Sequence, residues 1–223
     1  MMLLAKDRII EYKGYRFYVP KEIDARYLKA VLREDFEQRR FSRIDFRGKT
    51  VVDIGGFVGE TAIWFASQGA RKVYSIEAYA GLVKAMRINI IMNGLEEKIV
   101  PVHSLLSGDK KTGSMSRYPE TSGKISFAGD QKPRKMNFRE LVRMLPRGPK
   151  VLKCNINYLT DMSLFYNNDM KDVRALNIFD SMIIKTHIEK AKWGRAIAAL
   201  NGVFKSRWDD SKGSGYIIFE RRK

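Results

Sequence analysis

Apolar residues occur along the chain in short runs and in helical stripes, and the clearest group lies between residues 50 and 77. An apolar run at 50–54 leads into an aspartate and two glycines, Asp53, Gly55 and Gly56. The residues that follow place apolar side chains at helical spacing, and a second apolar run ends at Glu77. Strand, tight glycine turn, helix and strand form the first unit of a parallel α/β sheet. The pattern therefore predicts an α/β fold with small residues where a ligand approaches the backbone.

The rest of the chain continues the alternation of helices and strands. The predicted helices lie at 81–93, 136–145 and 190–200, and the predicted strands at 98–103, 151–154, 181–184, 203–208 and 214–220. Residues 107–133 are rich in Gly, Ser, Lys and Pro, which predicts a long loop with a weak hairpin at 124–127.

The first 45 residues are predicted to form an N-terminal extension of a main domain that spans 46–223. Residues 10–19 predict a small hairpin that turns at Lys13 and Gly14, and Pro20 ends it. Residues 23–40 carry apolar side chains at helical spacing, which predicts a helix packed on the sheet edge.

Composition limits the function classes. The chain has 44% hydrophobic and 30% charged residues, as expected for a globular protein. Its single cysteine, Cys154, allows no intrachain disulfide, which favours a reducing compartment and a cytoplasmic location. The apolar run at the start is too short for a signal peptide, and none reaches the roughly 20 residues of a membrane helix, so no membrane partner is predicted. Two histidines and one cysteine far apart in the sequence predict no metal site.

The net charge of +17 permits contact with nucleic acid, anionic lipid or an acidic substrate. Basic residues are densest at 131–153, where eight of them accompany Glu140 as the one acid. This stretch is the candidate for binding RNA or DNA. A solvated basic surface that only keeps the protein soluble is the alternative interpretation.

The composition of the turn favours S-adenosylmethionine (SAM) over a dinucleotide. A dinucleotide turn needs G-x-G-x-x-G, and here Phe57 and Glu60 occupy the second and third glycine positions. Glu60 suits the helix dipole but would repel a phosphate, whereas the sulfonium and ammonium groups of SAM are cationic. Glu77 would accept hydrogen bonds from both ribose hydroxyls. A βαβ unit that binds nothing is the simpler alternative.

Residues 48–66, 69–77 and 89–93 resemble the FkbM-type SAM-dependent methyltransferases, and the resemblance continues at 151–154 and 215–219. It implies a Rossmann-like class I methyltransferase fold, in which a seven-stranded, mostly parallel sheet has an antiparallel last strand and flanking helices. It also implies SAM as the methyl donor and a hydroxyl of a small molecule or sugar as the acceptor. The implied cofactor-binding positions are Asp53, Gly55, Gly56, Gly59, Glu77, Ala78, His103 and Ser104, the last two following the third strand.

The second half of the family pattern is altered. The family has approximately L-K-x-D-x-E-G-x-E after its fourth strand, whereas residues 152–160 are LKCNINYLT, so two carboxylates become Asn155 and Asn157. The family's E-x-H after the fifth strand becomes Lys185, Thr186 and His187. An amide cannot take a proton from a hydroxyl acceptor, whereas a histidine can. The candidate catalytic residues are therefore His187, Asn155, Lys153 and Asn157, and the altered positions predict slow or lost methyl transfer.

Two further functions stay open. The segment NINY at 155–158 is faintly similar to the N-P-P-Y motif of methyltransferases that act on nucleic-acid bases. In that reading Asn155 would hold the exocyclic amine of the base and Tyr158 would stack on its ring. The altered carboxylates also fit a protein that binds SAM without transferring its methyl group.

Overall fold

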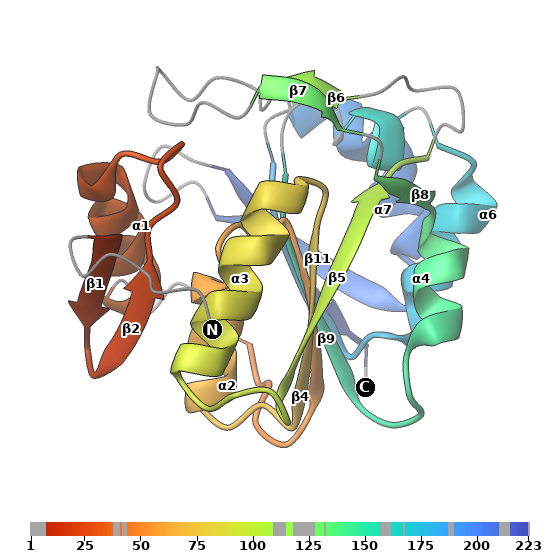
Figure 1. The fold of residues 1–223 in the computed structure, drawn as a ribbon. Coiled ribbons are helices and arrows are strands. Elements are labelled where there is room, and N and C mark those ends of the chain that lie inside the picture. Colours follow the sequence, from red (N-terminus) through yellow and green to blue (C-terminus); the bar gives the residue numbers. More distant parts are fainter. Residues whose placement is uncertain are drawn as a thin grey trace.

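The computed structural model describes residues 8–37, 41, 44–108, 115–117, 128–131, 133–156, 162–166, 168–186, 190–209 and 215–222. In these residues a central sheet has helices on both of its faces (Figure 1). The weak hairpin predicted at 124–127 lies outside the described residues.

A central sheet of eight strands contains all seven strands that the sequence predicts. In spatial order its strands are β11 (Phe204–Asp209), β12 (Tyr216–Arg221), β10 (Ser181–Lys185), β9 (Lys150–Asn155), β3 (Thr50–Ile54), β4 (Lys72–Glu77), β5 (Ile99–Leu106) and β8 (Arg134–Met136). Neighbouring strands from β10 to β8 are parallel. β12 is antiparallel to both of its neighbours, β10 and β11. The Rossmann-like methyltransferase fold with an antiparallel last strand is therefore confirmed.

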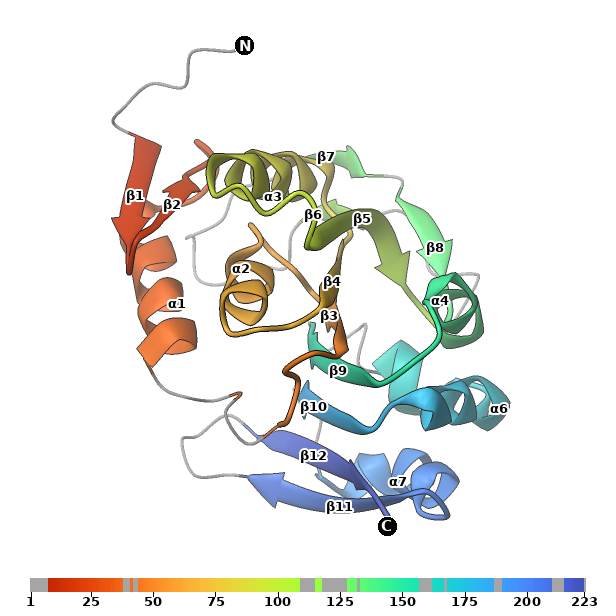
Figure 2. The same cartoon turned by 90° about the horizontal axis from the view of Figure 1, so that it is seen from below.

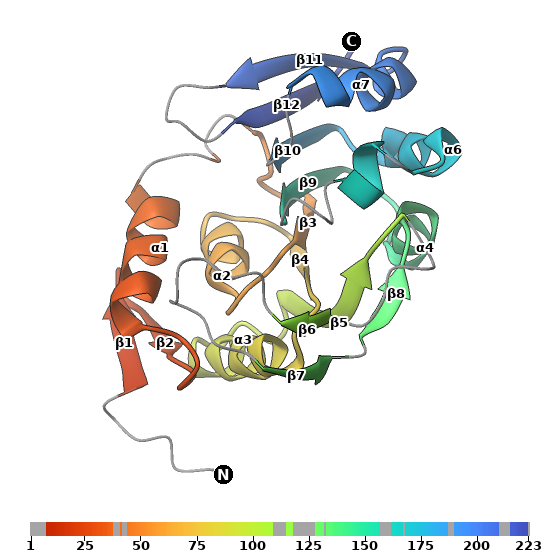
Figure 3. The ribbon, with the colours of Figure 1, turned by 90° about the horizontal axis from the view of Figure 1, so that it is seen from above.

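The eighth strand, β8, extends the sheet beyond the predicted seven. It pairs in parallel with residues 104–106 at the end of β5. Three residues, two of them basic, carry too little apolar pattern to predict a strand. A separate ribbon of β6 (Met115–Arg117) and β7 (Ala128–Gln131), also not predicted, lies at the carboxyl edge of the sheet (Figures 1 and 3).

Two hydrophobic clusters fill the two faces of the sheet. Along β3, Val51 belongs to one cluster, and Val52 and Ile54 belong to the other. The buried strands are apolar on both faces, as is usual in parallel sheets. The helices α1 (Ala25–Glu37), α2 (Glu60–Ser67) and α3 (Ala80–Met92) lie on one side (Figure 2). The helices α4 (Phe138–Met144), α6 (Met170–Val173) and α7 (Gly194–Leu200) lie on the other side, with the short helical segments η2 (Met162–Tyr166), η3 (Arg174–Ile178) and η4 (Lys190–Trp193).

The N-terminal hairpin has the predicted turn. β1 (Ile9–Tyr12) pairs with β2 (Tyr15–Tyr18), and the two turn residues, Lys13 and Gly14, both have positive φ, 50° and 82°. Two positive φ values match the twist of a tight hairpin. The helix predicted at 23–40 is observed as α1, but it packs against α2 and not on the sheet edge, because its buried side chains Leu28 and Leu32 join the cluster that covers α2.

Candidate cofactor site

Residues 55–59, called the glycine turn below, connect the carboxyl end of β3 to α2. The amide N–H groups of Gly55 and Gly56 both donate to the carbonyl oxygen of Ile76, each at 3.0 Å. Phe57 N donates to Glu77 Oε2 at 3.0 Å, and Gly59 N donates to the Gly56 oxygen at 2.8 Å. A pyrophosphate site uses such N–H groups as its ligands. Since these four are engaged within the protein, and one bonds a carboxylate, the turn is poorly suited to a phosphate.

The glycines of the turn have packing reasons of their own. Gly55 has φ +76°, and a Cβ there would lie 1.9 Å from the carbonyl oxygen of Asn155. A Cβ on Gly56 would lie 2.1 Å from Ser75 Oγ, and one on Gly59 would lie 2.8 Å from Met86 Cγ. The turn is pressed between β9, β4 and α3. The glycines alone therefore do not require a ligand, in contrast to the interpretation from the sequence.

Glu77 ends β4 beside the glycine turn. Its Oε1 accepts from Ala78 N at 2.8 Å and Tyr79 N at 3.0 Å, and its Oε2 accepts from Phe57 N. Burial raises the pKa of Glu77 to about 7, and the three N–H donors act in the opposite direction. An ionised carboxylate has about four lone-pair positions. Three of these positions are occupied by backbone N–H groups, which leaves about one for a ligand, and the predicted role of Glu77 in ribose binding stays a prediction.

A buried ion pair lies beneath the turn. Lys153 Nζ is 2.6 Å from Asp53 Oδ1 and donates to the Gly55 oxygen at 3.1 Å and to Thr61 Oγ1 at 3.3 Å. Burial lowers the pKa of Lys153, but attraction to Asp53 and Glu60 outweighs it and raises the pKa above its ordinary value. Lys153, predicted to be catalytic, is 3% exposed. Its three ammonium hydrogens match these three partners, so in this arrangement it holds the turn and does not face an acceptor.

Two further carboxyl groups share this buried layer, Glu60, which the sequence interpretation placed in the first helical turn, and Asp35, which it missed. Asp35 comes from α1 and Glu60 from the first turn of α2, and both are buried. Burial raises the pKa of Asp35 to about 7, with repulsion from Asp53 adding to it and Lys153 and Lys185 opposing it. Burial also raises the pKa of Glu60 well above its ordinary value, helped by repulsion from Asp35. Asp35 could have been found in the sequence, because it lies three residues after Leu32 and therefore on the same, apolar face of the predicted helix.

The acceptor side of the predicted site is described only in part. Asn155 is exposed at the end of β9, opposite Lys185 of β10 in the parallel register. Thr186 is buried, and its Oγ1 accepts a hydrogen bond from Trp193 Nε1 at 2.7 Å. Asn157, Tyr158 and His187 lie outside the described residues, so their predicted roles stay predictions.

His103 and Ser104 do not follow the third strand, as the sequence interpretation placed them, but lie within it. β5 continues to Leu106 because its last three residues pair with β8. Ser104 Oγ donates to the Arg134 oxygen at 2.6 Å. His103 is level with Glu77 in the register of β4 and β5, and its Nε2 lies 3.0 Å from the oxygen of Ala78. His103 and Ala78 therefore lie next to Glu77, whereas Ser104 is engaged at the sheet edge.

The described part of the basic stretch at 131–153 is divided among several elements, and not all of its basic side chains are exposed. Lys150 and Lys153 are buried on β9, and Lys150 Nζ donates to the Gly148 oxygen at 2.6 Å. Arg139 lies 3.5 Å from Asp172. The described members with exposed side chains include Arg134, Arg143 and Arg147, which belong to β8, to α4 and to the loop after α4.

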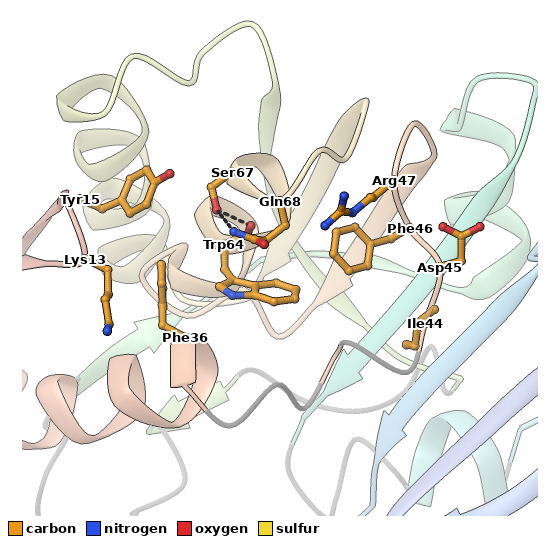
Figure 4. A pocket seen from close by; sticks show the side chains of 10 residues that line it. All are labelled: Lys13, Tyr15, Phe36, Ile44, Asp45, Phe46, Arg47, Trp64, Ser67 and Gln68. Atoms are coloured by element: carbon orange, nitrogen blue, oxygen red, sulfur yellow. Dashed lines mark hydrogen bonds between the residues drawn. The ribbon is translucent and has the colours of Figure 1, made fainter.

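A cavity of about 990 Å³ lies away from the predicted site residues, at the C-terminal end of α2 (Figure 4). Aromatic side chains of Tyr15, Phe36, Phe46 and Trp64 line it together with Lys13, Ile44, Asp45, Arg47, Ser67 and Gln68. The glycine turn is at the opposite end of α2, so this cavity and the candidate cofactor site are separate places in the molecule.

Within the described part of the chain, no cluster of three His, Cys, Asp or Glu side chains could hold a metal ion. Among the same residues, no helix is both long enough and apolar enough to cross a membrane.

Comparisons with known proteins give partial matches. No family model matches the chain, so the FkbM-type resemblance is not extended to membership. The chain is 43% identical over 60 residues to protein arginine N-methyltransferase PRMT10 of Arabidopsis thaliana, which covers 24% of this chain and 16% of the relative. It is 42% identical over 66 residues to ribosomal protein L11 methyltransferase of Carboxydothermus hydrogenoformans, which covers 29% of this chain and 22% of the relative.

Among solved structures, the chain is similar to a protein in the NADB-Rossmann superfamily from Streptococcus agalactiae. The TM-score is 0.51 at 12% identity, and the match covers 82% of this chain and 66% of that one. This likeness concerns the fold. The chain matches only 16% to 22% of the length of the two curated methyltransferases, so their acceptors are not transferred to it here.

The close approach of Gly55 to the backbone of Asn155 predicts that Gly55→Ala strongly destabilises the folded protein. The substitution adds left-handed strain and a clash with a backbone oxygen, so we expect a loss of about 3 kcal/mol or more in unfolding free energy, measured by urea denaturation. Gly94→Ala is the matched control, because Gly94 has φ +63° but nothing within 4 Å of a new Cβ. Its expected loss is about 1 kcal/mol. Equal losses in the two variants would show that β9 yields to the side chain.

The burial of Asp35 predicts that Asp35→Asn increases the stability of the folded protein, and that the increase depends on pH. A carboxyl whose folded pKa is raised to about 7 retains its proton in the folded protein and loses it in the unfolded one. The wild type therefore loses stability between about pH 4 and pH 7. We expect the stability of the variant relative to the wild type to rise by on the order of 2 kcal/mol between pH 5 and pH 7.5. Thermal unfolding at both pH values measures this. A variant that is less stable at pH 7.5 would show that Asp35 is ionised and favourably paired with Lys153.

Proposed function

We propose that this protein is a SAM-dependent methyltransferase. The observation that carries the proposal is the carboxylate of Glu77 at the end of β4, beside a glycine turn whose N–H groups at 55–57 and 59 are already engaged. Such a site suits a nucleoside without a phosphate. The two curated relatives, both named as methyltransferases, support the same reaction class.

The described residues fit SAM in its nucleoside part. The remaining lone-pair position of Glu77 accepts a ribose hydroxyl. Ala78 and His103, which lie side by side at the end of β4, are the candidates beside the adenine. The carboxylate of Asp53 beneath the turn is matched by the ammonium of Lys153, so this buried layer offers no excess positive charge to bind a phosphate.

For the acceptor, we propose a hydroxyl group on a small molecule or a sugar, as the resemblance to the FkbM-type family implies. Lys153 is engaged beneath the turn, so Asn155 at the end of β9 is the described residue nearest to this role. His187 remains the proposed base. An amide at 155 orients an acceptor but takes no proton from it, so hydroxyl methylation is expected to be slow.

A protein acceptor is the second candidate, favoured by the names of the two curated relatives, of which the arginine N-methyltransferase is named for a nitrogen. The amino group of a nucleic-acid base, held by Asn155, stays as a further outcome of the acceptor test. The division of the basic stretch among β8, α4 and β9 gives that outcome less support. Cys154 is buried and forms no disulfide, which is in keeping with work in a reducing compartment such as the cytoplasm.

Titration calorimetry of the wild type with SAM, its demethylated product and NADH tests the cofactor. We expect binding of the first two and not of NADH. Glu77→Gln should weaken SAM binding more than about tenfold, because it removes a charged acceptor for the ribose and loosens Phe57. Asp172→Asn is the matched control, since Asp172 is a buried carboxylate that accepts from Phe138 N, Arg139 N and Asn168 Nδ2 on the other face of the sheet. Absence of SAM binding by the wild type would refute the proposed function.

The acceptor is tested with a methyl-transfer screen over sugars, small hydroxyl compounds, protein substrates and RNA. If hydroxyl groups are the acceptors, Asn155→Asp combined with Asn157→Glu should raise the rate, since general-base help is worth about 10²–10⁴. SAM affinity should change little, because Asn155 bears on the turn only through its backbone oxygen. A fast wild type with slower acidic variants would instead identify the amides as the working groups and favour a nitrogen acceptor.

A further inference from the structure

In the N-terminal hairpin, the backbone of β2 is hydrogen-bonded to two asparagines, Asn89 of α3 and Asn93 directly after that helix. Tyr18 N donates to Asn89 Oδ1 at 2.6 Å, and Arg16 N donates to Asn93 Oδ1 at 2.9 Å. Residues four apart on a helix rise about 6 Å, and residues two apart on a strand rise about 6.6 Å. The two side-chain amides therefore match the spacing of the strand and satisfy its edge.

The two asparagines differ in where their amide hydrogens go. Asn93 Nδ2 donates to the oxygen of Arg16 at 2.7 Å and to that of Asn89, also at 2.7 Å, so its side chain joins only the hairpin and its own helix. Asn89 Nδ2 donates to the oxygen of Val58 at 2.8 Å, inside the glycine turn. Asn89 is completely buried. One amide thus connects the backbone of β2 to the backbone of the glycine turn.

Two further contacts hold the same part of the turn. The ring of Tyr27 on α1 meets the ring of Phe57 edge to face, with centroids 6.2 Å apart. Phe57 has φ 48°, an uncommon backbone conformation for a residue with a side chain, and its N–H is the one that bonds Glu77. Gly59 packs on Met86, which precedes Asn89 by one helical turn. The N-terminal segment therefore acts on the residues that position Glu77 relative to the turn.

We infer that residues 9–37 are a working part of the cofactor site, and that Asn89 is the positioning residue that couples the hairpin to the glycine turn. The inference rests on the proposed function for its consequence, which is SAM affinity. Its structural part concerns the turn itself and holds without ligand. The hairpin keeps Asn89 in place from one side, and Asn89 keeps the Val58 peptide oriented from the other. A buried amide with both ends bonded has little freedom to move.

The test compares Asn89→Ala with Asn93→Ala. Both variants remove a hydrogen bond to the hairpin edge, but only the first also frees Val58. Hydrogen exchange is measured without ligand at the amides of Gly59 and Ile63, which bond within the turn and its helix. SAM affinity is measured well below both melting temperatures. We expect faster exchange at 59–63 and about tenfold weaker SAM binding in Asn89→Ala, and changes below about twofold in Asn93→Ala.

A second variant separates positioning from general stability. In Asn89→Asp the side chain still accepts from Tyr18 N, but it can donate to the Val58 oxygen only when it is protonated. The ratio of SAM affinity between variant and wild type should therefore rise towards one as the pH is lowered and the new carboxyl takes up its proton. A ratio that does not change with pH, or equal exchange in the two alanine variants, would overturn the coupling.

The two ideas fail in different ways. A wild type that does not bind SAM refutes the proposed function, and the exchange comparison still decides whether Asn89 holds the turn. Normal SAM binding by the wild type, together with equal affinities in the two alanine variants, refutes the role of Asn89 and leaves the proposed function standing.

Discussion

The candidate site depends on one buried ion pair, that between Lys153 and Asp53. The ammonium of Lys153 joins β9 to β3 and, through the Gly55 oxygen, to the glycine turn. Removing both charges from water is costly, and the cost is offset here because Asp53 also accepts from Ser75 Oγ at 2.9 Å and Thr61 Oγ1 at 3.3 Å. Loss of either partner would leave a charge buried without compensation. The central strands and the turn therefore behave as one polar unit inside an apolar layer.

The turn is fixed from four directions, and this is what makes it suitable for binding. β9 holds Gly55, β4 holds Phe57 through Glu77, α3 holds Val58 through Asn89, and α1 packs Tyr27 against Phe57. A backbone that is already held loses little entropy when a ligand arrives. The segment before residue 46, predicted as an extension, contributes two of these constraints, one directly and one through α3. It shares its hydrophobic cluster with α2 and α3, and so belongs to the site physically.

The sequence predicted the elements whose pattern is local. The run at 50–77 and the turn at Lys13 and Gly14 were recognisable because apolar periodicity and positive φ are properties of neighbouring residues. β8 and the partners of Ser104 were missed, since a three-residue strand exists only through its pairing with β5. Asp35 was missed for a similar reason. Its environment is created by Glu60 and Lys153, which are distant in the sequence. Lys153 was predicted to be catalytic, and its three partners beneath the turn, which are also distant in the sequence, give it the task of holding the turn.

The structure separates two of the positions at which the sequence differs from the FkbM-type pattern, Lys185 and Asn155, by their electrostatic surroundings. Lys185 stands where the family pattern has an acid, and its positive charge opposes the rise in the pKa of Asp35 on α1. The positive charge of Lys185 at the end of β10 thus acts on Asp35, an acid of α1 that belongs to none of the motifs read from the sequence. Burying Asp35, Asp53 and Glu60 in one layer costs less when Lys153 and Lys185 face them. Asn155 is in a different situation, because it is exposed at the end of β9. Under the proposed function, an amide instead of a carboxylate at this position alters what an acceptor meets and leaves the buried charges as they are. In that proposal the difference at the end of β9 is the one that bears on methyl transfer, whereas Lys185 at the end of β10 belongs to the electrostatics of the fold.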